Sequence, residues 1–246
     1  FMSCWAGLPI YVLFAQMFFG DYAMLAAYSL YVIGVVAAIV VAKVANWLYP
    51  LPEENALLIE LPAYKMPNAY TVAIYVWEKV KDYLSKAGTI IFLMSIVLWF
   101  VLNYNIHGPA ADVSQSFGAS IGRFLVPLLA PAGLGLWQLG VALLCGLSAK
   151  EVVVSSCAVL FSVSNINSDA GMAALSATLG AAGFGPVNAY AFMVFCLLYT
   201  PCAATIGTIK RESHSWAFTL KQVLFQLVFA WAAAVLVFQL GSRLFG

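Results

Sequence analysis

Charged side chains are scarce in this sequence of 246 residues, since Asp, Glu, Lys and Arg together make up only 9% of it. An ordinary soluble domain is about a quarter charged. Hydrophobic residues account for 64%, and the mean hydropathy is +0.95, so a water-soluble chain of this size would be left with a largely apolar surface. The net charge of +1 provides no basic face, which argues against nucleic acid as a partner. We therefore expect the lipid bilayer to be the solvent of this chain.

Several motifs of catalytic and metal-binding proteins are also missing. No GxxxxGK[ST], GxGxxG or HExxH sequence occurs, and the two histidines, His107 and His214, are too far apart in sequence to suggest a His-rich metal site. The five cysteines form no CxxC pair and have apolar or small neighbours, which favours free thiols over disulfides. We therefore expect a protein that is not an enzyme.

Six apolar stretches are present, and we expect each to be a helix that crosses about 30 Å of hydrocarbon. They cover residues 5–20, 22–49, 87–104, 135–164, 189–208 and 216–244. The alternation that β-barrel strands require is absent. The expected fold class is therefore all-α, a polytopic helical membrane protein with interrupted or re-entrant helices.

Polar residues divide this chain into three parts: the first two spans at 1–49, a loop at 50–86, and gate-type helices at 87–246. The loop carries four prolines at its start, and its residues 68–86 follow a helical period with charges on one side. We predict one amphipathic helix there, on the membrane surface. Its lysines place the loop in the cytoplasm by the positive-inside rule. The connectors 105–134 and 165–188 carry a single basic residue, Arg123, and are expected to be external loops.

The fourth stretch has two adjacent charges, Lys150 and Glu151, in the middle of apolar and small residues. Ionisable groups inside a membrane are costly and usually face a cavity or a partner. Gly146 and Ser148 permit a helix break there, which would free backbone carbonyls to line a site. The alternative is that Lys150 extends to the membrane surface while Glu151 bonds to another helix and only stabilises assembly.

The fifth stretch is interrupted by Pro201, which removes a backbone donor and disfavours helical geometry at Thr200. Cys202 and Thr205 lie at this interruption, where a thiol is a candidate soft ligand for a transition metal. The alternative is a simple proline kink beside a small buried cysteine.

The start of the chain has a similar character, because Cys4 precedes Gly7 and Pro9 in an apolar stretch and Met2 offers a thioether. Paired interrupted segments are typical of transporter binding sites. The chain starts with Phe1, and its opening has no basic region typical of a signal peptide. We expect it to begin in the middle of a longer protein.

Four blocks of this sequence resemble one family, ferrous iron transport protein B (FeoB). They are IELPAYKMPNAYTVAIYVWEKVKDYLSKAGTII at 59–91, GLSAKEVVVSS at 146–156, TPCAATIGTIKRE at 200–212 and MSCWAGLPIYVLF at 2–14. The resemblance implies import of Fe²⁺, the transported substrate, across the bacterial cytoplasmic (inner) membrane. It also implies control by an N-terminal GTP-binding domain that uses GTP and Mg²⁺, which we expect to be absent from this chain together with the first half of the permease.

The resemblance carries over a set of pathway residues. Cys4, Cys202 and Glu151 are the candidate Fe²⁺ ligands, supported by Lys150, Ser155, Thr200, Pro201, Thr205 and Met2. The expected partners are the lipid bilayer, the missing N-terminal half, small cytoplasmic accessory proteins and further copies of the chain. Two other functions stay open: a nucleoside or other solute permease with similar gate helices, and a structural or regulatory membrane subunit.

Overall fold

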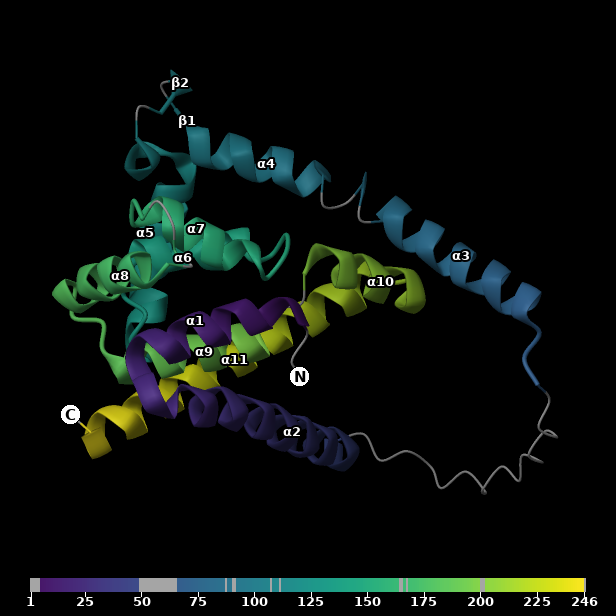
Figure 1. Cartoon of the computed structure of the whole chain (residues 1–246), viewed down its shortest axis with the longest axis horizontal. Coiled ribbons are helices and arrows are strands. Elements are labelled where there is room, and N and C mark those ends of the chain that lie inside the picture. Colours follow the sequence, from purple (N-terminus) through teal and green to yellow (C-terminus); the bar gives the residue numbers. More distant parts are fainter. Residues whose placement is uncertain are drawn as a thin grey trace.

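The computed structural model describes residues 5–48, 66–86, 88–89, 92–106, 108–110, 112–163, 166, 168–199 and 202–245 (Figure 1). Nearly all secondary structure in these ranges is helical, which confirms the all-α class. The elements in chain order are η1 (Trp5–Gly7), α1 (Leu8–Phe19), η2 (Gly20–Tyr22), α2 (Ala23–Leu48), α3 (Ala69–Lys86), α4 (Phe92–Asn103), β1 (Tyr104–Asn105), β2 (Gly108–Pro109), η4 (Val113–Gln115), α5 (Phe117–Leu129), η5 (Ala130–Ala132), α6 (Trp137–Cys145), α7 (Val152–Leu160), α8 (Asp169–Ala181), α9 (Pro186–Leu198), α10 (Ala203–Ser213) and α11 (Trp216–Phe245).

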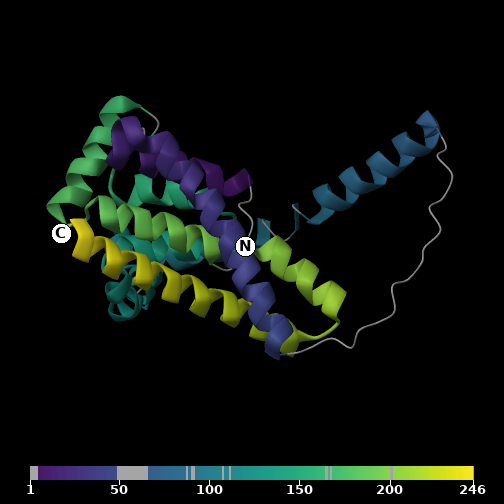
Figure 2. The same ribbon diagram turned by 90° about the horizontal axis from the view of Figure 1, so that it is seen from below.

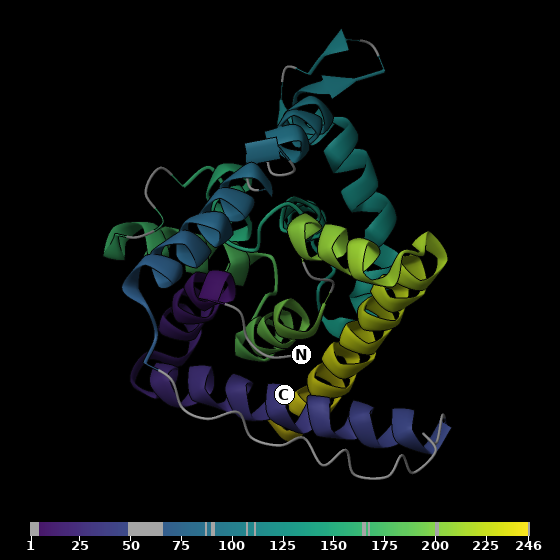
Figure 3. The same cartoon turned by 90° about the vertical axis from the view of Figure 1, so that its right-hand side faces the viewer.

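Helix α9 is the centre of the bundle. Its side chains from Ala191 to Leu198 are all buried, as expected for a helix that is apolar on every side. Helices α1, α2 and α11 pack against it, and Figure 3 shows α9 inside the angle between α2 and α11. The Phe14 and Phe192 rings of α1 and α9 lie 4.9 Å apart between centroids, and Ser29 Oγ of α2 lies 2.6 Å from Tyr190 Oη. The first half of α9 is thus held against α1 and α2.

Fewer helices than the predicted six are long enough to cross a membrane. Among the described residues, three helical runs are long and apolar enough to cross a membrane: Leu8–Trp47, Pro186–Ser213 and Trp216–Leu244. The number of candidate spans rises to four if the bent pair α5–α6 is counted as one span. Residues 5–20 and 22–49, expected to be two spans, fall in the single apolar run Leu8–Trp47. The expected span 87–104 includes residues 87, 90 and 91, which lie outside the described residues, and it stays a prediction. Helices α1 and α4 have 12 residues each, or about 18 Å. Gly20, with φ of 49°, ends α1, and Figures 1 and 2 show α1 and α2 meeting there in a V.

The outer face of α2 is apolar. Val32, Val36 and Ile39 recur at helical spacing and are half or more exposed. Water would penalise such a continuous apolar stripe, whereas lipid tails solvate it. This face supports the bilayer as the environment of the bundle.

Two segments expected to be loops contain helices. Within 105–134 the chain forms α5, which starts at Ser116, whose hydroxyl accepts a hydrogen bond from Ala119 N at 3.2 Å. Within 165–188 it forms α8, which starts at Ser168, bonded in the same way to Gly171 N at 3.1 Å. An N-terminal serine cap satisfies backbone donors that a helix start leaves free. The two connectors were predicted to be loops from their lack of basic residues, a signal that does not exclude a capped helix.

The amphipathic stretch at 68–86 forms α3, which confirms the predicted helix. Figures 1 and 2 show it standing apart from the bundle. Its described side chains are exposed, among them Tyr70 and Trp77. Its place on a membrane surface stays a prediction.

The start of α9 is fastened to the turn before α6 by a single side chain. Asn188 accepts a hydrogen bond from Gly185 N at 3.1 Å and donates one to Gly133 O at 2.7 Å. Gly133 has φ of +72°, and a Cβ there would meet the Phe238 ring and, at 2.9 Å, Asn188 Nδ2. The position therefore requires glycine both for its backbone conformation and for space.

Replacing Gly133 by alanine is expected to lower the free energy of unfolding by about 2–4 kcal/mol, from left-handed backbone strain and overpacking. Gly180 is the matched control, because a Cβ there has no heavy atom within 4 Å and the residue is in α8. Gly180→Ala should be neutral or stabilise by about 0.5–1 kcal/mol. Thermal unfolding of both variants in detergent measures the difference, and equal midpoints would contradict the assignment.

Candidate functional site: two broken helices that meet

The first helix break covers residues 146–151, between α6 and α7. It confirms the break predicted from Gly146 and Ser148. Tight turns satisfy its backbone: Ser148 N donates to Cys145 O at 3.1 Å, and Val152 N donates to Ala149 O at 3.0 Å. Each flanking helix has nine residues, about 14 Å. Neither could cross the hydrocarbon alone.

The second break follows α9, which ends at Leu198, and precedes α10, which begins at Ala203. This interruption of the fifth stretch was also predicted, although Thr200 and Pro201 themselves lie outside the described residues. Cys202 begins α10: its carbonyl accepts hydrogen bonds from Thr205 N at 2.9 Å and Ile206 N at 3.1 Å. Its Sγ lies 3.5 Å from Thr205 Oγ1. The thiol is therefore at the exact start of a helix and is partly exposed.

The two breaks contact each other. Ala203 N, at the start of α10, donates to Leu147 O in the first break at 2.8 Å. In the opposite direction, Lys150 Nζ donates to Cys196 O in the last turn of α9 at 3.0 Å. Lys150 Nζ also lies 4.9 Å from the centroid of the Tyr199 ring. One backbone hydrogen bond and one side-chain hydrogen bond thus join the first break to the end of α9 and the start of α10.

Tyr199 fits into the first break because residue 146 has no side chain. A Cβ on Gly146 would collide with Tyr199 Oη and approach Val153 Cγ2 to 2.5 Å. Tyr199 is 4% exposed, and its hydroxyl has no hydrogen-bond partner among the described residues. Sequence reasoning missed Tyr199 and the role of Cys196 O, because an aromatic residue in an apolar helix and a backbone carbonyl have no distinctive sequence signal.

The other predicted residues are distributed around this junction. Glu151 is exposed at the start of α7, and Ser155 is exposed one turn further on the same side of that helix. Cys4, Met2, Thr200 and Pro201 lie outside the described residues. No group of three or more His, Cys, Asp or Glu able to hold a metal ion occurs in the part of the chain that the structure describes. The convergence of Cys4, Cys202 and Glu151 therefore stays a prediction.

The chain also contains a serine motif that is typical of hydrolases. Gly118, Ser120 and Gly122 form a Gly-x-Ser-x-Gly sequence, which in hydrolases places the serine on a sharp strand-to-helix turn. Here all five residues are in the continuous helix α5, and Ser120 Oγ donates to Ser116 O at 3.3 Å. The motif therefore has no catalytic geometry.

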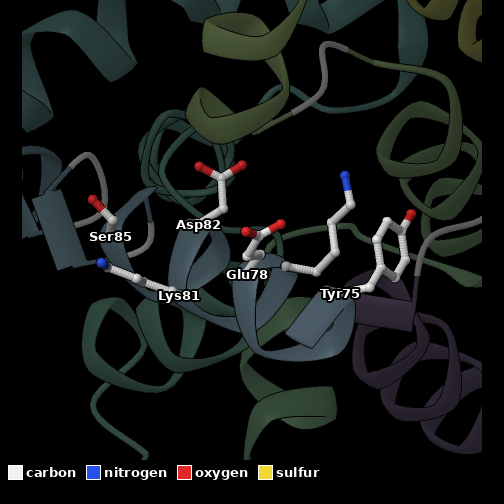
Figure 4. A pocket seen from close by; sticks show the side chains of 6 residues that line it. Tyr75, Glu78, Lys81, Asp82 and Ser85 are labelled. Carbon is white, nitrogen blue, oxygen red and sulfur yellow. The ribbon is translucent and has the colours of Figure 1, made fainter. Parts of the chain in front are cut away.

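A pocket on α3 is separate from the two breaks (Figure 4). It is lined by Tyr75, Glu78, Lys79, Lys81, Asp82 and Ser85. Its two acidic and two basic side chains balance one another, and Lys79 Nζ lies 5.3 Å from the Tyr75 ring centroid. The pocket contains no soft ligand. It is the surface of a solvated amphipathic helix.

The fit between Gly146 and Tyr199 gives a testable pair of substitutions. Gly146→Ala is expected to lower the free energy of unfolding by about 1–3 kcal/mol through overpacking. Tyr199→Phe removes the colliding oxygen and the unsatisfied hydroxyl, so the double variant should recover part of that loss, the Val153 contact accounting for the remainder. Thermal unfolding of the two single variants and the double variant measures the coupling. Strict additivity would contradict the contact.

Comparison with known proteins places these breaks in a family. The sequence model of the Gate family, described as nucleoside recognition, matches residues 84–216, which include both breaks. That of the ferrous iron transport protein B C terminus matches residues 27–79. No solved structure is significantly similar to the chain.

Individual relatives extend the similarity to nearly the whole chain. The Fe(2+) transporter FeoB of Staphylococcus aureus (strain MSSA476) is 40% identical over 242 residues, 98% of this chain and 35% of the relative. The FeoB of Methanocaldococcus jannaschii is 37% identical over 99% of this chain and 36% of its own length. A Porphyromonas gingivalis fusion of Fe(2+) transport protein A and FeoB is 33% identical over 99% of this chain and 34% of its own length.

The chain thus spans about a third of the length of these relatives. The similarity confirms the resemblance drawn from the four motif blocks, and the match to the Gate model covers more than half of the chain. The chain therefore belongs to the Gate family, and along nearly its whole length it matches the C-terminal part of ferrous iron transport protein B.

Proposed function

We propose that this chain forms part of an Fe²⁺ permease and that ferrous iron passes through the junction of the two helix breaks. The observation that carries the proposal is the direct bonding of the breaks, Leu147 O to Ala203 N and Cys196 O to Lys150 Nζ. Broken helices that meet within a membrane are the usual construction of a transporter site, because their free ends supply backbone groups to the ion. The names of the similar proteins support Fe²⁺ as the substrate.

The side chains at the junction suit a ferrous ion. Fe²⁺ is intermediate in softness and accepts sulfur, carboxylate and carbonyl ligands. Cys202 supplies a thiol at the second break, and Glu151 supplies a carboxylate at the first. Cys4 and Met2 are proposed as further sulfur ligands, with Thr200, Thr205 and Ser155 as oxygen donors along the route. Few ligands at any one point keep the binding weak enough for release.

The rest of the transport apparatus is proposed from the relatives. Because this chain corresponds to about a third of their length, control by a GTP-binding domain with GTP and Mg²⁺ would depend on residues beyond it. The fusion of transport protein A to a FeoB relative supports a small accessory protein of that type as partner. We further propose a multi-pass location in the cytoplasmic membrane, with spans at 1–49, a cytoplasmic segment at 50–86 and gate helices at 87–246.

The description of the Gate family leaves one competing substrate class, nucleosides. Relatives that cover the same residues carry the name Fe(2+) transporter, so ferrous iron is favoured. Uptake of labelled Fe²⁺ in the presence of excess nucleoside separates the two substrate classes, because a nucleoside permease would lose uptake and an iron permease would not. A rise in the unfolding temperature on addition of Fe²⁺ would argue against a purely structural subunit.

Replacing Cys202 by serine in the intact transporter is expected to reduce Fe²⁺ uptake about tenfold or more, since a hydroxyl is a far weaker ligand for Fe²⁺ than a thiolate. Uptake of labelled Fe²⁺ by cells or proteoliposomes, corrected for the amount of protein in the membrane, is the measurement. Cys157→Ala is the control, because Cys157 is fully buried in the core and should leave uptake unchanged. Normal uptake by the Cys202→Ser protein would remove that thiol from the route.

A further inference from the structure

Lys150 has a specific place at the junction rather than a general role in charge balance. Its stem is half-buried, and its ammonium group reaches across the first break to the last turn of α9. Carbonyls in the last turn of a helix lack partners within that helix. The hydrogen bond to Cys196 O at 3.0 Å therefore occupies a backbone group that an ion could otherwise use.

Two independent features make this position attractive to cations. The carboxyl end of a helix carries a partial negative charge, and the face of an aromatic ring is negative because of its quadrupole. Lys150 Nζ lies against both, 3.0 Å from Cys196 O and 4.9 Å from the centroid of the Tyr199 ring. In a medium of low dielectric constant both attractions are stronger than in water.

The neighbouring hydroxyl of Tyr199 is a further polar group at this point. Tyr199 Oη is buried and has no hydrogen-bond partner among the described residues, although buried hydroxyls normally have one. It points into the first break, where the absence of a side chain at Gly146 makes room for it. A water molecule or a hydrated ion in the break would satisfy it.

We propose that Lys150 is a tethered cation that seals the junction against monovalent cations and is displaced by the transported divalent metal ion. The ammonium group is held at its site by the chain, so its effective concentration there is high, on the order of millimolar or more. A free K⁺ or Na⁺ carries the same charge and gains little by replacing it.

A divalent ion competes differently. It carries twice the charge, so its attraction to the carbonyls of α9 is about twice as strong at equal distance. If the proposed function holds, Fe²⁺ also gains the Cys202 thiol and the Glu151 carboxylate, ligands for which K⁺ has little affinity. Lys150 would therefore favour Fe²⁺ over K⁺ and Na⁺ both because of the higher charge of Fe²⁺ and because of its affinity for the thiol ligand.

The test uses the intact transporter in proteoliposomes, with K⁺ flux and labelled Fe²⁺ uptake measured in parallel. Lys150→Met keeps the length of the side chain and removes the charge, and is expected to raise K⁺ flux about tenfold or more, as loss of a charged hydrogen bond implies. Lys210→Met is the matched control, because Lys210 Nζ also lies over a ring, 5.5 Å from the Trp216 centroid, but on α10. The K⁺ flux of the Lys210→Met protein should equal that of the unmodified protein.

Two further variants follow from the geometry. Lys150→Arg retains the positive charge and should restore part of the seal relative to Lys150→Met. Tyr199→Leu removes the ring face and should raise K⁺ flux, whereas Tyr199→Phe retains the ring and should raise it less. If the methionine variant does not fold, Lys150→Gln carries the same expectation, because it keeps a donor but no charge.

Background K⁺ flux in the Lys150→Met or Lys150→Gln protein would overturn the proposal. Equal leakage in the Lys210→Met protein would also overturn it, because the leak would then reflect general loosening. The two hypotheses remain separable. An unmodified protein that takes up no Fe²⁺ refutes the proposed function, whereas the dependence of K⁺ flux on residue 150 is measured without Fe²⁺.

Discussion

Every backbone amide and carbonyl inside a bilayer needs a partner within the protein or in a water-filled cavity, and this requirement is most demanding where a helix stops. Two helices stop near each other here, after Cys145 and after Leu198. The first break satisfies part of its backbone by tight turns, and the hydrogen bond between Leu147 O and Ala203 N connects it to the second. Because each break supplies partners to the other, neither can straighten into a continuous helix without leaving polar groups of the other unpaired.

Close backbone approach helps to hold the scaffold around the junction. Helices α5 and α6 meet at 103°, and a Cβ on Gly122 would come within 2.7 Å of Trp137 O. A Cβ on Gly140 would come within 3.4 Å of Gly122 O. Small residues allow helices to approach closely where lipid offers no hydrophobic driving force between them. Trp231 of α11 adds a hydrogen bond to Leu128 O at 2.7 Å, which fastens the last turn of α5 to α11.

The sequence predicted the helical class and both helix breaks because their signals are local: long apolar runs, a proline, small residues and intramembrane charges. It failed on α5 and α8, because the connectors that contain them were assigned as loops from their scarcity of basic residues, while the serine caps that start both helices were not recognised. It correctly placed a boundary at Gly20, where α1 ends, but it counted the stretches on either side as two spans, whereas Leu8–Trp47 meets the length and composition criteria as one apolar run. The partners of Lys150 could not be predicted, because Cys196 lies 46 residues away and their contact depends on how the first break lies against the end of α9.

Lys150 and Glu151 point in different directions because they are adjacent in sequence. Neighbouring residues cannot face the same way on a helix or a tight turn, and here the ammonium group is directed to the end of α9 while the Glu151 side chain is exposed. The cost of an intramembrane ammonium is offset by a carbonyl, an aromatic face and the helix dipole. If ferrous iron passes through the junction as proposed, it would meet the exposed carboxylate of Glu151 before the end of α9, which Lys150 already occupies.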